Sequence, residues 1–166
     1  DRDEFDAIHE LCADMSPEDM HELLMKLKPH RRKKLVDILE KEIDPETYPY
    51  LDKEVLNELL EQMSPSYIAS IINELESDDA LRIIEDLDEE RRGSILRQLN
   101  SKLKKAVEEG LTFPEDSAGR IMQKEMVAVP IFWTVGKTID YLRAAAENLP
   151  EKFYDIFVID PMYKVV

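Results

Sequence analysis

Carboxylates are the most numerous side chains in this sequence that could take part in chemistry. The chain has 37 Asp and Glu residues against 22 Lys and Arg, a formal net charge of −15 over 166 residues. Such an excess either keeps the protein soluble or gathers carboxylates around hard divalent cations, and composition leaves both explanations open. The densest cluster contains Asp86, Asp88, Glu89 and Glu90. We interpret that cluster as a solvated helix face.

Other reactive sites are not indicated. The histidines His9, His21 and His30 are scattered, and Cys12 is the only cysteine, so neither a zinc site nor a disulfide framework is predicted. The four glycines, at positions 93, 110, 119 and 136, form no phosphate-binding loop. No Ser–His–Asp or Cys–His arrangement is suggested. We therefore predict that the chain is not an enzyme and that it works in a reducing compartment.

The charge also argues against two classes of partner. Nucleic-acid phosphates and anionic membrane surfaces would be repelled, so we predict no nucleic-acid partner and no membrane contact by this piece of chain. No signal peptide is visible, and no apolar run reaches the roughly 18 residues of a membrane helix. The first residue is Asp1, and the last residues read as a strand. We expect an excised fragment of a longer protein.

A twelve-residue repeat organises most of the chain. Each unit has an apolar anchor, a short polar cluster and then an apolar pair such as Ile71-Ile72 or Ile83-Ile84, and only the unit around Thr47-Tyr48 is irregular. Twelve residues hold about two and a half helical turns plus a cap. The anchors are Met15, Leu27, Leu39, Leu51, Met63, Leu75, Leu87, Leu99 and Leu111.

Helices this short are unstable alone and must bury their apolar stripes against neighbours. Short connections make those neighbours antiparallel, so we predict a mainly α fold, a right-handed superhelical array of short antiparallel helices. Ser16, Ser64 and Asp88 are expected N-caps. The basic run from His30 to Lys34 is interpreted as a charge-balanced solvent face, and Tyr48 and Tyr50 are expected to cover the seam of the array.

The pattern changes after Gly110, an expected helix C-cap. We predict a helical-repeat domain over 1–110 and a linker over 111–125, with one helical turn at 117–122. A partial β-α-β module should then occupy 126–166, with strands at 126–129 and 154–160 and a helix at 137–148. Its apolar strands would be left uncovered.

The run from Phe113 to Met122, FPEDSAGRIM, followed by VAVP at 127–130 and Thr134-Val135, resembles the junction of MgtE-type magnesium transporters. In that family an acidic helical-repeat N domain precedes the first of two CBS motifs, and the resemblance extends over the whole chain. It implies homodimeric Mg²⁺ channels whose cytosolic domains sense Mg²⁺. Mg²⁺ bound between the N and CBS domains favours the closed pore. The chain would be the cytoplasmic portion of a bacterial inner-membrane protein, and its partners would be Mg²⁺ and the missing CBS and transmembrane domains.

The resemblance also supplies candidate ligands. Asp78 and Asp79 occupy the acidic pair that starts a repeat helix in the family, where an aspartate contributes to an interfacial Mg²⁺ site, and Glu46 falls near another acidic position. A further family aspartate is replaced by Arg82. Alternatively, Asp78 serves only as a helix cap with a favourable dipole interaction.

Two functions are weighed. The first is a Mg²⁺-sensing regulatory region of a magnesium transporter. The alternative is a helical-repeat interaction scaffold fused to a CBS module, with no transport role. Five apolar spans after a second CBS motif in the gene beyond Val166 would distinguish the first from the second.

Overall fold

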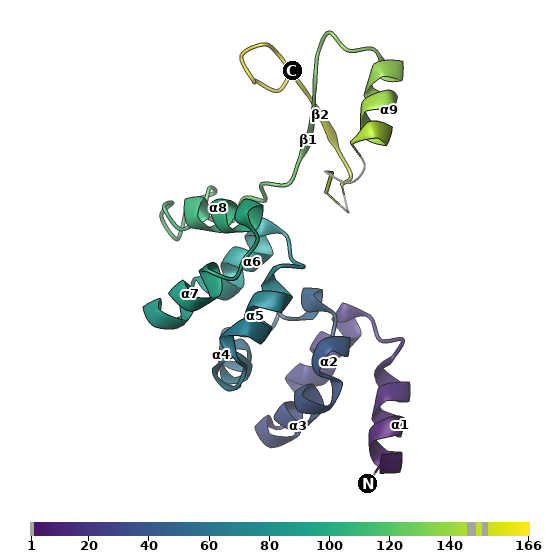
Figure 1. The fold of residues 1–166 in the computed structure, drawn as a ribbon, viewed down its shortest axis with the longest axis vertical. Coiled ribbons are helices and arrows are strands. Elements are labelled where there is room, and N and C mark those ends of the chain that lie inside the picture. The colour runs from purple at the N-terminus through teal and green to yellow at the C-terminus, as the bar shows by residue number, and fades with distance from the viewer. Residues whose placement is uncertain (1, 146–148, 151–152) are drawn as a thin grey trace. The chain divides into compact units, whose positions relative to one another are not determined.

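The computed structural model describes residues 2–145, 149–150 and 153–166. The chain divides into two compact units, Asp1–Met122 and Gln123–Val166. Unit 1 is an array of short helices, and unit 2 contains two strands and a helix (Figure 1). This mainly helical fold with a small sheet confirms the predicted fold class. Residues 111–122, predicted to be linker, belong to unit 1.

Short helices follow one another through unit 1, most of them within the twelve-residue frame. The α-helices are α1 (Arg2–Cys12), α2 (Pro17–Lys26), α3 (Pro29–Leu39), α4 (Lys53–Gln62), α5 (Pro65–Ile72), α6 (Ser77–Ile84), α7 (Glu89–Leu96) and α8 (Ser101–Gly110), and the 3-10 helices are η1 (Glu40–Glu42) and η2 (Pro45–Thr47). Helix α5 packs against α7, and α6 packs against α8.

Polar side chains begin several of these helices as predicted. The hydroxyl of Ser16 accepts a hydrogen bond from the Asp19 N–H, and that of Ser64 accepts from Tyr67. Asp88 caps α7 in the same way, 2.9 Å from the Arg91 nitrogen. Each cap satisfies an N–H group that has no partner inside its helix. Pro17 and Pro65 then take the first helical position, where a missing N–H costs nothing.

The apolar repeat forms the core of unit 1. Both members of the pairs Leu59-Leu60, Ile71-Ile72 and Ile83-Ile84 are buried, as are the anchors from Leu39 to Leu99. The outer anchors Met15 and Leu111 are partly buried and pack against the same cluster. The predicted repeat therefore identifies the residues that hold the array together.

Three expectations for single residues are wrong. Arg32, assigned to a solvent face, is buried because its guanidinium reaches acceptors on two other helices. Tyr48 is buried as expected, but Tyr50 is 58% exposed and does not cover the seam. Gly110 is the last helical residue of α8, and its φ is not positive, so it is not a left-handed cap.

Unit 2 has the predicted β-α-β order. Strand β1 (Val127–Pro130) pairs in parallel with β2 (Ile156–Ile159), with Val127 opposite Ile156, and α9 (Val135–Ala144) lies between them in sequence. The hydroxyl of Thr134 caps α9. Val127 and Val129 are buried, whereas Ile156, Phe157 and Val158 are exposed. The predicted end of the helix at 146–148 lies outside the described residues.

Candidate metal centre

The predicted acidic pair lies at the start of α6. Asp78 and Asp79 are in the first turn of that helix, where the free N–H groups favour negative charge. Both side chains are partly buried. The Oδ1 atom of Asp78 is buried, and no hydrogen-bond partner for it exists among the described residues. A buried oxygen without a donor is unfavourable and marks a place where a cation or water would be stabilised.

Asp79 lies in a strongly acidic environment. Burial, followed by the charge of Asp78, raises its pKa from 3.8 to about 6; Glu46 raises this pKa further, and Arg82 lowers it. The charged form of Asp79 is therefore disfavoured by lost hydration and by two like charges. The structure thus places all three predicted ligand residues in one neighbourhood, here called the carboxylate cluster (Glu46, Asp78 and Asp79).

Glu46 comes to the cluster from η2, in the segment where the repeat is broken. The side chain of Asp44 caps η2 by accepting the Glu46 N–H at 2.9 Å. The interruption at Asp44 and Pro45 thus has a local consequence: it interrupts the run of regular helices and places Glu46 where its charge raises the pKa of Asp79 in α6.

Tyr50 and Arg82 complete the surroundings of the carboxylate cluster. The Arg82 guanidinium carbon lies 5.9 Å from the centre of the Tyr50 ring, within the range of a cation–π contact. The charge of Asp79, more than burial, raises the pKa of the Tyr50 hydroxyl. Sequence reasoning noted Arg82 only as a departure from the family pattern and did not connect Tyr50 with the site. In the structure, Arg82 is a counter-charge for the carboxylate cluster, and the Arg82 guanidinium lies against the Tyr50 ring.

The carboxylate cluster is not a complete metal shell. Within the described ranges, no group of three or more His, Cys, Asp or Glu side chains is arranged to hold a metal ion. Mg²⁺, however, keeps several waters and commonly takes only one or two protein carboxylates. The donor set therefore fits a largely hydrated Mg²⁺ and does not fit a tightly coordinated ion.

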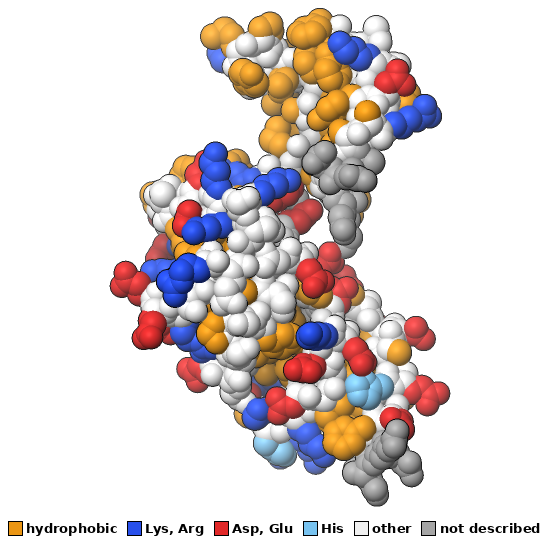
Figure 2. Space-filling model, in the orientation of Figure 1, with side chains coloured by type: hydrophobic (Ala, Val, Ile, Leu, Met, Phe, Trp, Pro, Cys, Tyr) orange, Lys and Arg blue, Asp and Glu red, His pale blue; other side chains and the backbone are white. Residues whose placement is uncertain are grey.

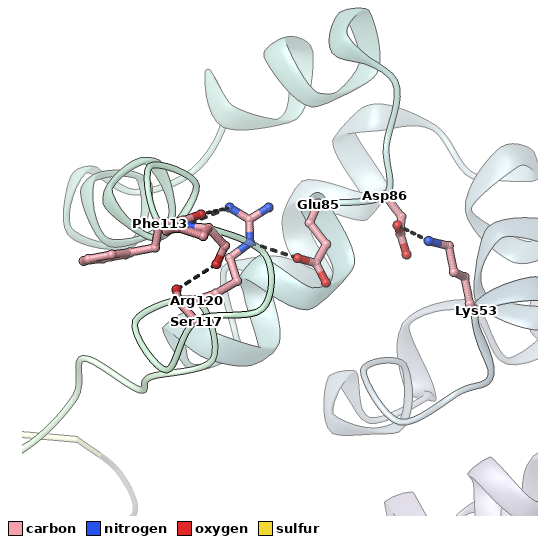
Figure 3. Close-up of polar contacts among 8 residues, drawn as sticks. Lys53, Glu85, Asp86, Phe113, Ser117 and Arg120 are labelled. Carbon is pink, nitrogen blue, oxygen red and sulfur yellow. Dashed lines mark hydrogen bonds and ion pairs between the residues drawn. The ribbon is translucent and has the colours of Figure 1, made fainter.

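The second acidic cluster is used differently. Asp86 forms an ion pair with Lys53 of α4 (Figure 3), and Asp88 caps α7. Glu89 and Glu90 are exposed in the first turn of α7. This second acidic cluster is therefore a solvated face with one ion pair and one helix cap.

Comparisons with known proteins give one family. The model of the MgtE intracellular N domain matches residues 15–116. A crystal structure of the cytosolic domain of the Mg²⁺ channel MgtE in complex with ATP is 28% identical, with a TM-score of 0.78 over 95% of this chain and 64% of that one. The soluble part of a magnesium transporter is 22% identical, with a TM-score of 0.76 over 99% and 65%, a likeness of fold alone.

The chain spans just under two thirds of the length of each of these solved structures. No curated protein sequence matches it. Among the helices described, none combines the length and the apolar character that crossing a membrane would require.

Proposed function

This chain belongs to the family of the MgtE intracellular N domain, and on that premise we propose that it is the Mg²⁺-sensing cytosolic region of a magnesium transporter. The proposed role is regulatory and not enzymatic. The carboxylate cluster at the start of α6 supports the proposal best, because it holds a buried Asp78 oxygen without a donor beside an Asp79 whose pKa is raised. The two similar structures are the cytosolic domain of the Mg²⁺ channel MgtE and, as a likeness of fold alone, the soluble part of a magnesium transporter.

The carboxylate cluster supplies half of a binding site. Asp78 and Asp79, with Glu46 beside them, would hold a hydrated ion and present it to a facing acidic surface of the same protein. When bound, Mg²⁺ supplies positive charge between two surfaces that otherwise repel each other. Arg82 already offsets part of the negative charge on this side. The site is therefore expected to be weak and responsive to free Mg²⁺ at about millimolar levels.

The ion changes the state of the transporter only through its different affinity for two arrangements of the protein. A shift from mostly open to mostly closed requires roughly 5 kcal/mol. One largely hydrated ion does not provide that difference. Several weak sites, on both chains of a homodimer and on its CBS and transmembrane domains, would act together to favour the closed state.

A charge-neutralising substitution tests this proposal in the full-length protein. Asp78→Asn combined with Asp79→Asn keeps the size of both side chains and removes their charge. We expect this double variant to stay sensitive to protease at Mg²⁺ concentrations that protect the wild-type protein. Glu89→Gln with Glu90→Gln is the matched control, because that pair occupies the first turn of the next helix and is exposed.

Equal protection of the double variant and the wild type would contradict the role of the carboxylate cluster. If Mg²⁺ protected none of the three proteins, the interaction scaffold without a transport role would be the better account. The experiment therefore separates a wrong site from a wrong function.

A further inference from the structure

Arg120 lies in the segment that the sequence predicts to be a linker, yet only 8% of it is exposed. Its Nε atom donates to Oε2 of Glu85 at 3.1 Å (Figure 3). Its Nη1 atom donates to the carbonyl oxygens of Gly110 and Phe113, at 3.2 and 3.4 Å. A buried guanidinium is tolerated only when its donors are satisfied. Arg120 therefore stays buried only while residues 111–120 are folded against α6 and α8.

Two glycines allow this close packing. A Cβ atom on Gly110 would lie 2.6 Å from Cδ2 of Leu81, a residue of α6. A Cβ on Gly119 would lie 2.7 Å from Cδ1 of Phe113. The Arg120 N–H also donates to the Ser117 carbonyl at 3.0 Å, so 117–120 forms a turn where a helical turn was predicted. Residues 111–120 are thus a packed loop, here called the 111–120 loop.

The 111–120 loop is attached to the helix that carries the candidate ligands. Glu85 is the C-cap residue of α6, and Asp78 and Asp79 lie in its first turn. The adjacent Asp86 pairs with Lys53 of α4 (Figure 3). Helix α6 therefore has two residues of the carboxylate cluster in its first turn and the Glu85–Arg120 contact at its C-cap residue. The residue that follows, Asp86, connects the same end of the helix to α4.

The chain changes character immediately after Arg120. Ile121 and Met122 are 76% and 48% exposed, and residues 121–126 form neither helix nor strand. The boundary between the two units falls after Met122. We propose that Arg120 is a positioning residue that locks the 111–120 loop to α6, so that residues 2–120 move as one body and residues 121–126 are the hinge for unit 2. A regulatory role for the hinge at 121–126 rests on the proposed function, because a Mg²⁺-dependent movement of unit 2 would start there.

Distances between spin labels test the hinge in the 166-residue chain without Mg²⁺. Cys12→Ser removes the only cysteine, and Glu61→Cys and Asp140→Cys place one label on an exposed position of each unit. We expect Arg120→Ala to broaden the distance distribution between the labels. We also expect amide hydrogen exchange in the 111–120 loop to rise at least tenfold, with α4 and α5 unchanged.

Three variants accompany this measurement. Glu85→Gln keeps the size of the acceptor and should loosen the 111–120 loop partly, and Arg120→Lys should give an intermediate effect because an ammonium lacks the guanidinium fork. Arg97→Ala removes the exposed arginine at the C-cap position of α7 and should change nothing.

An unchanged distance distribution and unchanged exchange in Arg120→Ala would overturn the inference. A rise in exchange spread equally through the array would also overturn it, because Arg120 would then only stabilise the core. Neither readout involves Mg²⁺, so a protein that ignores Mg²⁺ would sink the proposed function and leave this result intact.

Discussion

The charged form of Asp79 is unfavourable in the folded protein. Asp79 loses hydration and faces two like charges, which together raise its pKa to about 6. Arg82 lowers this pKa, but burial and the charge of Asp78 have the larger effects and raise it. The energy stored in such a group is released when a proton or a cation arrives. A residue of this kind suits a sensor, since ligand binding relieves a penalty already present in the folded protein.

This penalty predicts an effect on stability that depends on pH. A carboxyl group whose pKa is raised on folding stabilises the protein fully below its ordinary pKa near 4, and this contribution is lost as pH rises through about 6. Asp79→Asn should therefore raise the free energy of unfolding by about 1 kcal/mol at pH 7.5 without Mg²⁺, a figure discounted for partial exposure. Urea unfolding at pH 7.5 and pH 4 measures it.

The difference between Asp79→Asn and the wild type should disappear at pH 4. Glu74→Gln is the control, because Glu74 is exposed and should show no comparable gain at either pH. An Asp79→Asn variant less stable than the wild type at pH 7.5 would show that the dipole interaction with α6 outweighs the burial of the charge.

At the scale of elements, arginines cap the carboxyl ends of helices. Arg32 of α3 donates to the carbonyls of Leu24 and Leu27 at the end of α2. Arg91 of α7 donates to those of Leu60 and Met63 at the end of α4. Arg120 donates to the carbonyls of Gly110, the last residue of α8, and of Phe113. The last carbonyls of a helix lack partners and carry partial negative charge, so a cation there is favourable. Short helices have many such ends, and Arg32 and Arg91 each connect one helix of unit 1 to another that lies elsewhere in the sequence.

Arg32 provides the sharpest test of this arrangement. Its guanidinium is buried and also pairs with Glu58 of α4 at 2.6 Å. Arg32→Ala would leave Glu58 and two carbonyls without their donors, and we expect it to lower the free energy of unfolding by about 3–5 kcal/mol. Arg31→Ala, at the exposed neighbouring position, should change it by less than about 0.5 kcal/mol. Urea unfolding measures both variants. Similar decreases in the free energy of unfolding would contradict the role given to Arg32.

At the scale of the whole molecule, the two units differ in how completely they bury apolar surface. Unit 1 has a continuous apolar core, and charged side chains of both signs are scattered over the face that Figure 2 shows. In unit 2, β2 exposes Ile156, Phe157 and Val158, each by 37–40%, and Tyr154 is 92% exposed. Apolar strand surface of this kind favours contact with another surface.

We therefore expect the 166-residue chain to associate at high concentration through unit 2. Sedimentation velocity should show a larger species that persists in high salt, because apolar contacts are not screened. Val158→Asp should weaken this association, whereas Lys102→Glu, an exposed change on α8, should not. Strictly monomeric behaviour at high concentration would be inconsistent with an exposed apolar strand acting in this way.

Short-range sequence patterns predicted much of the secondary structure and of the core. The twelve-residue spacing of anchors such as Leu75 and Leu87 predicts which faces are buried, because helix periodicity and capping depend on residues a few positions apart. The short apolar run at 126–129, ahead of Pro130, likewise predicted β1. The predicted ligands came from resemblance to a family, and their role stays a prediction. Nothing in the local pattern distinguishes Arg32 from Arg31, which share a helix and a residue type.

The order of helices, the repeat and the β-α-β piece could thus be inferred from the chain alone, since each follows from short-range spacing. Tertiary structure decided which polar groups meet. Arg32 and Glu58 are 26 residues apart, and Arg120 and Glu85 are 35 apart, and each pair forms only when separate helices are stacked. The same stacking brings Glu46 beside Asp79, buries part of its surface and raises its pKa. Burial and charge proximity are properties of the assembled helices, and they determine what the carboxylates can do.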